Sequence, residues 1–555
     1  MLAGLMQHQP LLVSSILRHA ARHHAAGEVV SRRDDGSVVR TTYAGLAARA
    51  RRLAKALLRL GVAQSDRVGT LAMNSDRHLE LYYAIMGMGA VCNTINPRLA
   101  QSDIAYIADH AEDGVLFADP IFASLVAAIA PSLTATLRTV VLLCAEDDMP
   151  KLALPDGMQL HCYETLLAAE DDAYAWPSFD ENAASGLCYT SGTTGRPKGV
   201  LFSHRATVLH AMMMAMADTT GIRATDRVLP VVPMFHVNAW GVPFAAPMTG
   251  AALILPGRHL DPDSLIGLMD GERVSVSAGV PTVWLGVLAK LRERGTRLAT
   301  VERLLAGGSA VPRAMMVEFG KLGVTISHAW GMTESSPVAT VNAPKPATLA
   351  LGAEARFDEA ATQGRTVFGI DVRAENDAGE VPWDGRTQGN FAFRGHWVAS
   401  AYYRMPESSV GDDGWFPTGD VGVVTPEGFI ALTDRTKDLI KSGGEWISSI
   451  ALENIAIAHP EVAEAAAIAV PDDKWGERPL LIVVPRPGKA PTQDALRAFY
   501  RDKVPNWSIP DRVIIAESLP HGATGKILKT ELRRIYAGAR PSSLATTAEP
   551  GAVSR

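Results

Sequence analysis

The chain has 555 residues, which is too long for a single hydrophobic core, so we expect two or more domains. Its residues are 47% apolar and 20% charged, as in an ordinary globular enzyme. The formal net charge of −6 argues against a general nucleic-acid binder, because basic residues are not in excess.

The N-terminal segment MLAGLMQHQPLLVSSILRHAARHH lacks the basic start, apolar core and small-residue cleavage site of a signal peptide. No apolar run is long enough to span a membrane, and the best candidate, residues 242–255, is interrupted by Pro243, Pro247 and Gly250. The four cysteines have no CxxC spacing and are interpreted as reduced core thiols: Cys92, Cys144, Cys162 and Cys188. We therefore expect a soluble, cytoplasmic protein without a transmembrane segment.

Helices and strands alternate in the first 180 residues. A helix is predicted over 43–60, because Leu46, Ala50, Leu53 and Leu57 share one face and Gly61 follows as a stop. A strand over 67–73 and a second helix over 78–89 come next. This alternation predicts an α/β fold with a mainly parallel sheet.

The sequence YTSGTTGRPKG, residues 189–199, lies between a predicted strand at 186–190 and a predicted helix that begins at His204. Its glycines let backbone N–H groups approach an anion, its hydroxyls donate hydrogen bonds, and Lys198 supplies a positive charge. The segment therefore predicts a polyphosphate-binding loop, with a flexible surface turn as the alternative. It is not a P-loop, because Pro197 stands where the glycine before the lysine is required.

Two segments after this loop contain apolar groups that suit either a substrate pocket or the core. Four methionines crowd the predicted helix, and core packing is favoured over an acyl tunnel: Met212, Met213, Met214 and Met216. The sequence PMFHVNAWG, residues 233–241, predicts a loop over a cavity. The alternative is that Phe235, His236 and Trp240 are core residues.

Two further segments carry groups suited to a nucleotide. AGGSAVP, residues 306–312, has glycines that allow close approach to the backbone, although such turns are common. HAWGMTESSP, residues 328–337, places an aromatic ring, a hydroxyl and a carboxylate within five residues. These groups suit stacking on a base, donating to a phosphate and binding a hard divalent cation.

The last third of the chain begins with DDGWFPTGD, residues 412–420, in which Asp420 can accept hydrogen bonds from ribose hydroxyls or act as an N-cap. A small α/β region follows the charged segment DRTKD, residues 434–438, with strands predicted at 465–470, 480–484 and 512–516. Its size suits a lid domain rather than an independent enzyme. Lys526 lies on the glycine-bearing segment PHGATGKILK, and a disordered tail is predicted beyond it.

These motifs, in this order, resemble the signature of the adenylate-forming superfamily, which includes acyl-CoA synthetases, peptide-synthetase adenylation domains and luciferases. HVNAW and GGEWISS are most similar to bacterial medium- and long-chain fatty acyl-CoA synthetases. The resemblance covers the chain up to its tail. It implies a large N-terminal domain over 1–434, a small mobile C-terminal lid over 435–540 and a disordered tail over 541–555.

The resemblance assigns catalytic roles to Thr333, Glu334 and Lys526, with Glu334 binding Mg²⁺. It also assigns ATP or AMP binding to Thr190, Ser191, Gly192, Thr193, Thr194, Gly195, Lys198, Gly307, Gly308, Ser309, Trp330, Gly331, Thr333, Asp420 and Arg435. Trp330 stands where the family usually has tyrosine, so it keeps the ring face that stacks on adenine but lacks the phenol.

The implied reaction has two steps: a carboxylic acid and ATP give acyl-AMP and pyrophosphate, and coenzyme A then displaces AMP. For the acid, the resemblance implies a pocket at His236, Val237 and Trp240, with the tryptophan gating the tunnel. For the second step it implies that the lid turns about a hinge at Lys437. This rotation brings Gly443, Gly444 and Trp446 to the pantetheine tunnel.

The acid itself stays open between a fatty acid and a short acid such as 3-(methylthio)propionate. A carrier-protein-loading adenylation enzyme is disfavoured, because no carrier domain follows the lid. A luciferase-like oxygenase would need an oxygen or light assay to exclude it. A non-catalytic relative should have lost Lys526, Glu334 or Asp420, and all three are present. Related enzymes form dimers, so a homodimer is a further expectation.

Overall fold

The computed structural model describes residues 1–190, 196–405, 410–411, 413–443, 445–522 and 526–536. The chain divides into two compact units. Unit 1 comprises residues 1–311, 315–373 and 392–418, and unit 2 comprises residues 312–314, 374–391 and 419–555. The predicted α/β class, with a large N-terminal part and a smaller C-terminal part, is confirmed.

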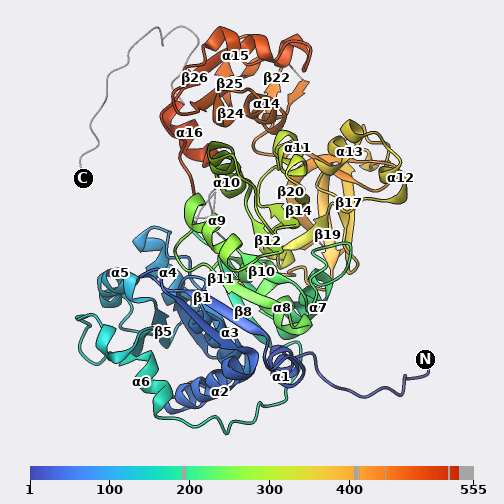
Figure 1. Ribbon diagram of the computed structural model, residues 1–555. Coiled ribbons are helices and arrows are strands. Elements are labelled where there is room, and N and C mark those ends of the chain that lie inside the picture. The colour runs from blue at the N-terminus through green and yellow to red at the C-terminus, as the bar shows by residue number, and fades with distance from the viewer. Residues whose placement is uncertain (191–195, 406–409, 412, 444, 523–525, 537–555) are drawn as a thin grey trace. The chain divides into compact units, whose positions relative to one another are not determined.

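Unit 1 contains two large sheets whose neighbouring strands are mostly parallel (Figure 1). The nine-stranded sheet has the order β16 (Arg365–Thr366), β15 (Val338–Val341), β14 (Thr325–Gly331), β13 (Arg303–Gly307), β12 (Val276–Gly279), β10 (Arg227–Pro230), β11 (Ala252–Leu255), β1 (Glu28–Arg32) and β2 (Val38–Thr42). The seven-stranded sheet has the order β7 (Gln159–Cys162), β6 (Thr139–Leu142), β5 (Val115–Ala118), β3 (Arg67–Leu71), β4 (Val91–Thr94), β8 (Ala184–Tyr189) and β9 (Gly199–Ser203).

Two smaller sheets complete the described strands. One has the order β18 (Gly379–Glu380), β17 (Ile370–Asn376), β19 (Gly389–Gly395), β20 (Phe416–Val424) and β21 (Ile430–Arg435). The other, in unit 2, has the order β23 (Glu445–Ile447), β22 (Ile440–Ser442), β25 (Gly476–Pro485) and β24 (Val462–Asp472), and β26 (Arg512–Ile515) also pairs with β25. The strands predicted at 465–470, 480–484 and 512–516 are therefore confirmed.

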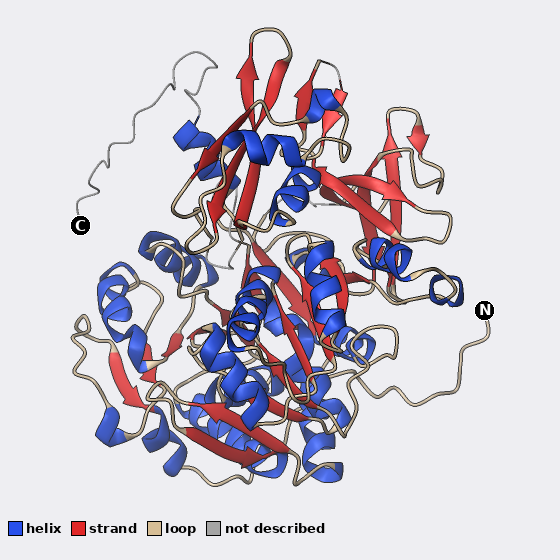
Figure 2. Ribbon diagram, turned by 45° about the horizontal axis from the view of Figure 1, so that its top comes forward, coloured by secondary structure: helices blue, strands red, loops and turns tan. Residues whose placement is uncertain are grey.

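Helices connect and cover these sheets (Figure 2). The α-helices are α1 (Val13–His23), α2 (Tyr43–Arg59), α3 (Asp76–Gly87), α4 (Gln101–Ala111), α5 (Ala123–Ile129), α6 (Tyr163–Ala168), α7 (His204–Met214), α8 (Val242–Thr249), α9 (Pro262–Gly271), α10 (Pro281–Arg294), α11 (Arg313–Lys321), α12 (Pro346–Leu349), α13 (Ala353–Ala360), α14 (Ser449–Ile457), α15 (Gln493–Phe499) and α16 (Lys529–Tyr536). The short 3₁₀ segments are η1 (Pro120–Phe122), η2 (Ala130–Ser132), η3 (Glu146–Asp148), η4 (Val237–Gly241), η5 (Thr333–Ser335) and η6 (Asn506–Ser508).

The helix predicted over 43–60 matches α2, whereas the one predicted over 78–89 begins and ends two residues earlier as α3, because Ser75 caps its start. The side chain of Thr42 accepts a hydrogen bond from the N–H of Gly45 at the start of α2, and Ser75 does the same for His78 in α3. Helix α2 ends just before Gly61, whose φ of +86° suits glycine. The sequence thus fixed these elements locally.

Successive residues of a strand point to opposite faces of its sheet, and the central strands of both large sheets pack into a different core on each face. In the nine-stranded sheet, Val228 belongs to a central core shared with α1, α2, α3, α7 and α8. The next residue, Leu229, belongs to a second core with α9, α10 and α11. In the seven-stranded sheet, Phe117 faces the central core and Leu116 faces a third core with α4 and α5. Unit 1 is therefore layered, with helices on both faces of each sheet.

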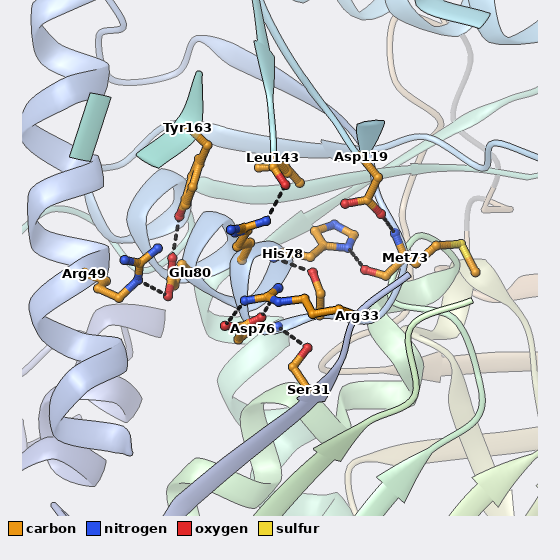
Figure 3. A network of polar contacts seen from close by, with 12 residues as sticks. Ser31, Arg33, Arg49, Met73, Asp76, His78, Glu80, Asp119, Leu143 and Tyr163 are labelled. Atoms are coloured by element: carbon orange, nitrogen blue, oxygen red, sulfur yellow. Dashed lines mark hydrogen bonds and ion pairs between the residues drawn. The ribbon is translucent and has the colours of Figure 1, made fainter. Parts of the chain in front are cut away.

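A polar network fixes helix α3 inside this layered structure (Figure 3). The fully buried carboxylate of Glu80 pairs with Arg49 Nε at 2.6 Å and accepts a hydrogen bond from the hydroxyl of Tyr163 at 2.5 Å. Asp76 pairs with Arg33 at 2.7 Å, which ties α3 to the segment that follows β1. Glu80 and Asp76 thus each have a guanidinium partner, which offsets the cost of burying a charge.

The apolar stretch 242–255 forms helix α8 and strand β11 rather than one long helix. Gly250 separates them with a φ of +82°. Across the described residues, no helix combines the length and the apolar character needed to cross a membrane. All four cysteines are buried free thiols, in agreement with the expectation of core thiols.

Candidate active site

The phosphate loop predicted from YTSGTTGRPKG connects two antiparallel strands, β8 and β9. The N–H of Thr190 donates to the carbonyl oxygen of Lys198 at 2.9 Å, which closes the base of the loop. Residues Ser191, Gly192, Thr193, Thr194 and Gly195 lie outside the described residues. Lys198 is exposed, and its ammonium nitrogen lies 4.8 Å from the centroid of the Tyr402 ring.

The motif HAWGMTESSP begins in strand β14 and continues into the turn η5. The Trp330 ring is half-buried against Phe393, with their centroids 4.7 Å apart. Gly331 allows the backbone of Pro337 to approach closely, because a Cβ at Gly331 would lie 1.7 Å from the Pro337 carbonyl oxygen. Thr333 and Glu334 follow in the turn, and both are buried.

Strand β13 brings the predicted adenine segment beside this motif. Gly307 pairs in parallel register with Ala329, and a Cβ on Gly307 would lie 2.5 Å from the Ala329 carbonyl oxygen. Gly308 has a φ of +84°, and Ser309 is exposed. Because β13 and β14 are parallel, Gly307 and Trp330 lie at the same carboxyl edge of the sheet, where α/β folds bind ligands.

The segment from 399 to 403 joins the phosphate loop to the Glu334 turn. The N–H of Ala399 donates to the Glu334 carbonyl oxygen, and the N–H of Tyr403 donates to the Gly199 carbonyl oxygen, both at 2.7 Å. Between them, the Tyr402 hydroxyl donates to Oε1 of Glu334 at 2.6 Å. Burial and this hydrogen bond raise the pKa of Tyr402, so the hydroxyl stays protonated. Sequence reasoning did not identify Tyr402, because its partners are distant in the chain.

The predicted acyl-pocket segment adopts a left-handed turn. Val237, Asn238, Ala239 and Trp240 have φ between +44° and +56°, and all four are buried. The Trp240 side chain is 7% exposed and belongs to the central core of unit 1. The chain here forms a tight turn that packs into the core, which agrees with the alternative that Trp240 is a core residue, and the pocket over this segment stays a prediction.

Hydrogen bonds from other elements hold this strained turn and the chain leading to it. The N–H of Val237 donates to Sγ of Cys188 at 3.3 Å. The Asn74 side-chain amide donates to the carbonyl oxygens of Pro230 and Val232, and its oxygen accepts from the N–H of Met234 at 2.6 Å. Non-glycine residues in the left-handed region persist where neighbouring contacts fix them, and they concentrate at functional sites.

Several site residues are uncharged at neutral pH for a physical reason. Burial lowers the pKa of His328 to about 4. Burial also raises the pKa of the Cys188 thiol.

Within the described part of the chain, no group of three or more His, Cys, Asp or Glu side chains is arranged to hold a metal ion. A magnesium ion bound mainly by phosphate oxygens would need fewer protein ligands.

In unit 2, the two residues predicted to bind ribose lie side by side. Asp420 on β20 and Arg435 on β21 are paired across the antiparallel ladder, and Arg435 Nε lies 3.3 Å from Oδ1 of Asp420. Asp420 is buried and Arg435 is partly exposed. This pairing of residues fifteen positions apart places a charged pair at the end of β21, opposite the middle of β20.

The predicted hinge, coenzyme A and lysine residues also belong to unit 2. Lys437 lies in the turn after β21. Its pKa is lowered mainly by burial and further by the positive charges of Arg435 and Arg533. Gly443 has a φ of +61°, and a Cβ there would lie 2.7 Å from the Trp475 ring. The Gly522 N–H donates to the Lys526 carbonyl oxygen at 2.7 Å, and residues 523–525 lie outside the described residues. Gly444 lies outside the described residues.

A cavity of about 190 Å³ lies beside Gly443 in unit 2. Trp475 and Trp507 line it with rings that are 44% exposed, and the guanidinium of Arg478 reaches it from a buried position. Arg478 is held by Asp511, with Nη2 at 3.0 Å from Oδ1. Sequence reasoning named Gly443 and Trp446 but missed this cavity, because the residues that line it are far apart in the chain. Trp446 itself is 49% exposed, with the Lys441 ammonium 5.4 Å from its ring centroid.

The sequence profile described as AMP-binding enzyme matches residues 17–403, and that described as AMP-binding enzyme C-terminal domain matches residues 451–526. The chain belongs to the AMP-binding enzyme family. The resemblance to adenylate-forming enzymes is thereby confirmed.

Curated members of the AMP-binding enzyme family match over nearly the whole chain. The chain is 48% identical to a 3-methylmercaptopropionyl-CoA ligase of Ruegeria lacuscaerulensis, over 96% of this chain and 98% of that protein. It is also 48% identical to a medium-chain-fatty-acid–CoA ligase of Ectopseudomonas oleovorans, over 96% and 97%. These relatives confirm the predicted enzyme class, an AMP-forming acid–thiol ligase.

A solved structure of the AMP-binding enzyme family has the same fold. An anthranilate CoA ligase in complex with anthranoyl-AMP matches with a TM-score of 0.84 and 23% identity, covering 96% of this chain and 99% of that chain. At this identity the match shows the fold alone.

Proposed function

We propose that this protein is an ATP-dependent acyl-CoA ligase that first converts a carboxylic acid and ATP to acyl-AMP and pyrophosphate, and then transfers the acyl group to coenzyme A. One observation in unit 1 carries the proposal. The phosphate-loop hairpin and the Thr333–Glu334 turn are both tied to the segment from 399 to 403. Lys198 and Glu334, whose charges suit a triphosphate and its cation, thus both contact this segment through Tyr402.

The first step needs charge neutralisation, because a carboxylate must attack the α-phosphorus of an anionic nucleotide. The carboxylate is ionised at neutral pH, so this step needs no general base. In our proposal, Lys198 and the phosphate-loop residues hold the β- and γ-phosphates, while Thr333 donates to the α-phosphate. Lys526 then offsets the charge that develops during adenylation.

The residues present fit a magnesium ion at Glu334. This carboxylate is buried, and the Tyr402 hydroxyl occupies Oε1, which leaves Oε2 for a hard cation. When bound, the ion neutralises phosphate charge. Glu334 would hold it, and the main chain of Ala399 would keep the turn in place.

For the nucleoside we propose adenine contacts at Gly307, Gly308, Ser309, Trp330 and Gly331, and ribose contacts at Asp420 and Arg435. Gly308 is exposed, so a flat base can approach its backbone, whereas Gly307 and Gly331 let neighbouring backbone pack closely beneath. Asp420 can accept from both ribose hydroxyls, and the Arg435 guanidinium lies 3.3 Å from its Oδ1.

For the second step we propose that coenzyme A uses Gly443, Gly444 and Trp446, and that Lys437 is the hinge of a lid over 435–540. In this scheme residues 1–434 form the large domain and 541–555 a tail. The cavity lined by Trp475 and Trp507 supports the coenzyme A assignment, because indole rings suit the adenine of that molecule.

The acid is the finer part of the proposal. We propose an aliphatic acid, most simply a medium-chain fatty acid, bound near His236, Val237 and Trp240. The 48% identity to a 3-methylmercaptopropionyl-CoA ligase specifically favours 3-(methylthio)propionate as a second candidate. A homodimer in a reducing cytoplasm completes the proposal, and the four buried free thiols suit that compartment.

Pyrophosphate release should be measured with 3-(methylthio)propionate, butanoate, octanoate and palmitate, with and without coenzyme A. The proposal predicts pyrophosphate from at least one acid and formation of the matching acyl-CoA when coenzyme A is added. Product AMP without a thioester would instead indicate a carrier-loading enzyme. No pyrophosphate with any acid would refute the function, and light scattering of the same sample would give the oligomeric state.

A further inference from the structure

The Tyr402 side chain contacts both ends of the site in unit 1. Its hydroxyl donates to the buried Glu334 carboxylate at 2.6 Å, and the Lys198 ammonium lies 4.8 Å from its ring centroid. The first contact is a charge-assisted hydrogen bond. The second is within the range of a cation–π interaction. One side chain therefore connects the phosphate-loop lysine with the buried acid.

The position of Tyr402 is fixed by the main chain on both sides. Ala399 is bonded to the Glu334 carbonyl and Tyr403 to the Gly199 carbonyl. The Tyr402 ring also lies near the buried Phe416, with centroids 6.3 Å apart. These main-chain bonds hold the Tyr402 backbone between the start of strand β9 and the turn η5, and the ring contacts favour the rotamer that reaches Glu334.

The chemistry of the pair is directional. A tyrosine hydroxyl donates one hydrogen bond, and a carboxylate only accepts. The bond to Oε1 therefore restrains rotation of the Glu334 carboxylate and leaves Oε2 as the oxygen available to a cation. Beside the same ring, the ammonium of Lys198 is restrained near the position proposed for phosphate oxygens.

We propose that Tyr402 is a positioning residue that aligns the Glu334 carboxylate and the Lys198 ammonium for magnesium-bound nucleotide. This rests on the proposed function, since it deepens the role of the same site. It predicts that Tyr402 acts on magnesium-dependent nucleotide binding and on adenylation. The transfer of a preformed acyl-adenylate to coenzyme A should not depend on it.

The test compares Tyr402→Phe, which keeps the ring but loses the hydroxyl, with Tyr402→Leu, which loses both. Tyr403→Phe is the matched control, because its ring packs near His110, with centroids 5.7 Å apart. Calorimetric binding of ATP at increasing Mg²⁺, and of ATP with EDTA, provides a readout independent of turnover. ATP–pyrophosphate exchange and thermal melting complete the set.

We expect Tyr402→Phe to raise the half-saturating Mg²⁺ concentration about 10-fold, the usual loss for a hydrogen bond to a charged group. Binding of ATP in EDTA, the melting temperature and the thioester step should stay close to wild type. Tyr402→Leu should also weaken ATP binding in EDTA, because the contact with Lys198 is lost. Tyr403→Phe should match wild type.

An unchanged magnesium dependence in Tyr402→Phe would overturn the proposal. So would a parallel fall in melting temperature, ATP binding in EDTA and the thioester step, which would identify a packing residue. Wild-type protein that binds magnesium–ATP but exchanges no pyrophosphate with any acid would refute the proposed function instead. The two failures are thus distinguishable.

Discussion

At single positions of the site, backbone atoms leave no room for a side chain. Gly331 lies where a Cβ would overlap the Pro337 carbonyl oxygen at 1.7 Å. The nearest atoms belong to the backbone of Pro337 and Ala339, so they cannot move aside as a flexible side chain could. The position therefore requires glycine for a steric reason that its φ angle does not reveal.

Replacing Gly331 with alanine should disrupt the turn that carries Thr333 and Glu334. We expect unfolding to become easier by about 1–3 kcal/mol, the usual cost of overpacking, and ATP–pyrophosphate exchange to fall at least 10-fold. Gly267→Ala on helix α9 is the matched control, because a Cβ there meets nothing within 4 Å. That variant should be slightly stabilised. A Gly331→Ala protein with normal exchange would contradict the steric argument.

The buried carboxyl of Asp119 makes a pH prediction possible (Figure 3). Burial raises its pKa from 3.8 to about 7, although Oδ2 accepts from the Met73 N–H at 2.7 Å. Since the folded-state pKa is raised, this group's stabilising contribution is complete below about pH 3.8 and is lost as the pH rises to about 7.

Asp119→Asn keeps an acceptor for the Met73 N–H but cannot ionise. We expect the unfolding free energy of Asp119→Asn to rise relative to that of wild type as the pH rises from 4 to 8. The difference should reach up to about 1.4 kcal/mol for each pKa unit by which Asp119 is shifted. Denaturant titrations at several pH values measure this. Asp473→Asn, at an exposed site, is the control. A constant difference between Asp119→Asn and wild type would mean that Asp119 does not titrate in this range.

At the scale of elements, the left-handed turn η4 links the core to the proposed acyl pocket. Four non-glycine residues with positive φ are costly, at about 1–2 kcal/mol each in regular structure. The bonds from Cys188 and Asn74 hold the turn and the chain before it against this strain. Trp240 at its end is both a core residue and the predicted gate.

We expect Trp240→Ala to lower the unfolding free energy by about 3–5 kcal/mol, because the indole is buried. As a gate, it should also change the ratio of activities on long and short acids more than the Michaelis constant for ATP. Each added methylene in a newly opened path is worth roughly 0.8 kcal/mol. Trp284→Ala, another buried core tryptophan, is the control that should lower stability alone. An unaltered chain-length profile in Trp240→Ala would leave only the packing role.

At the scale of the whole molecule, the proposed roles of Lys526 and Lys437 divide the two half-reactions. Lys526→Ala should reduce adenylation about 100-fold or more, the usual loss for an electrostatic contact in catalysis, and leave thioester formation from supplied acyl-adenylate largely intact.

Lys437→Pro should restrict the backbone at the proposed hinge and slow the thioester step more than adenylation. Separate assays of the two steps measure both. Equal losses in both steps for either variant would contradict the division of roles.

The sequence by itself determined the elements and the chemistry of the motifs. Helices α2 and α3 follow from apolar spacing and capping residues, and strand β8 follows from an apolar run before glycines, because these causes act between near neighbours in the chain. The resemblance carried by the motifs in their order indicated the family, which the relatives confirmed. The resemblance did not predict the left-handed turn of Val237–Gly241. The Val237 N–H in this turn donates to Cys188, and the chain just before it is bonded to Asn74, which lies 160 positions before Met234.

Only the tertiary structure placed Asp420 opposite Arg435 and brought the Tyr402 hydroxyl to Glu334, 68 positions earlier. It also showed that Gly331 is required by the Pro337 carbonyl and that a cavity lies beside Gly443. Such contacts depend on strand register and on the packing of segments far apart in the sequence. Local patterns specify which groups a site contains, whereas the distance and direction between those groups are set by the fold.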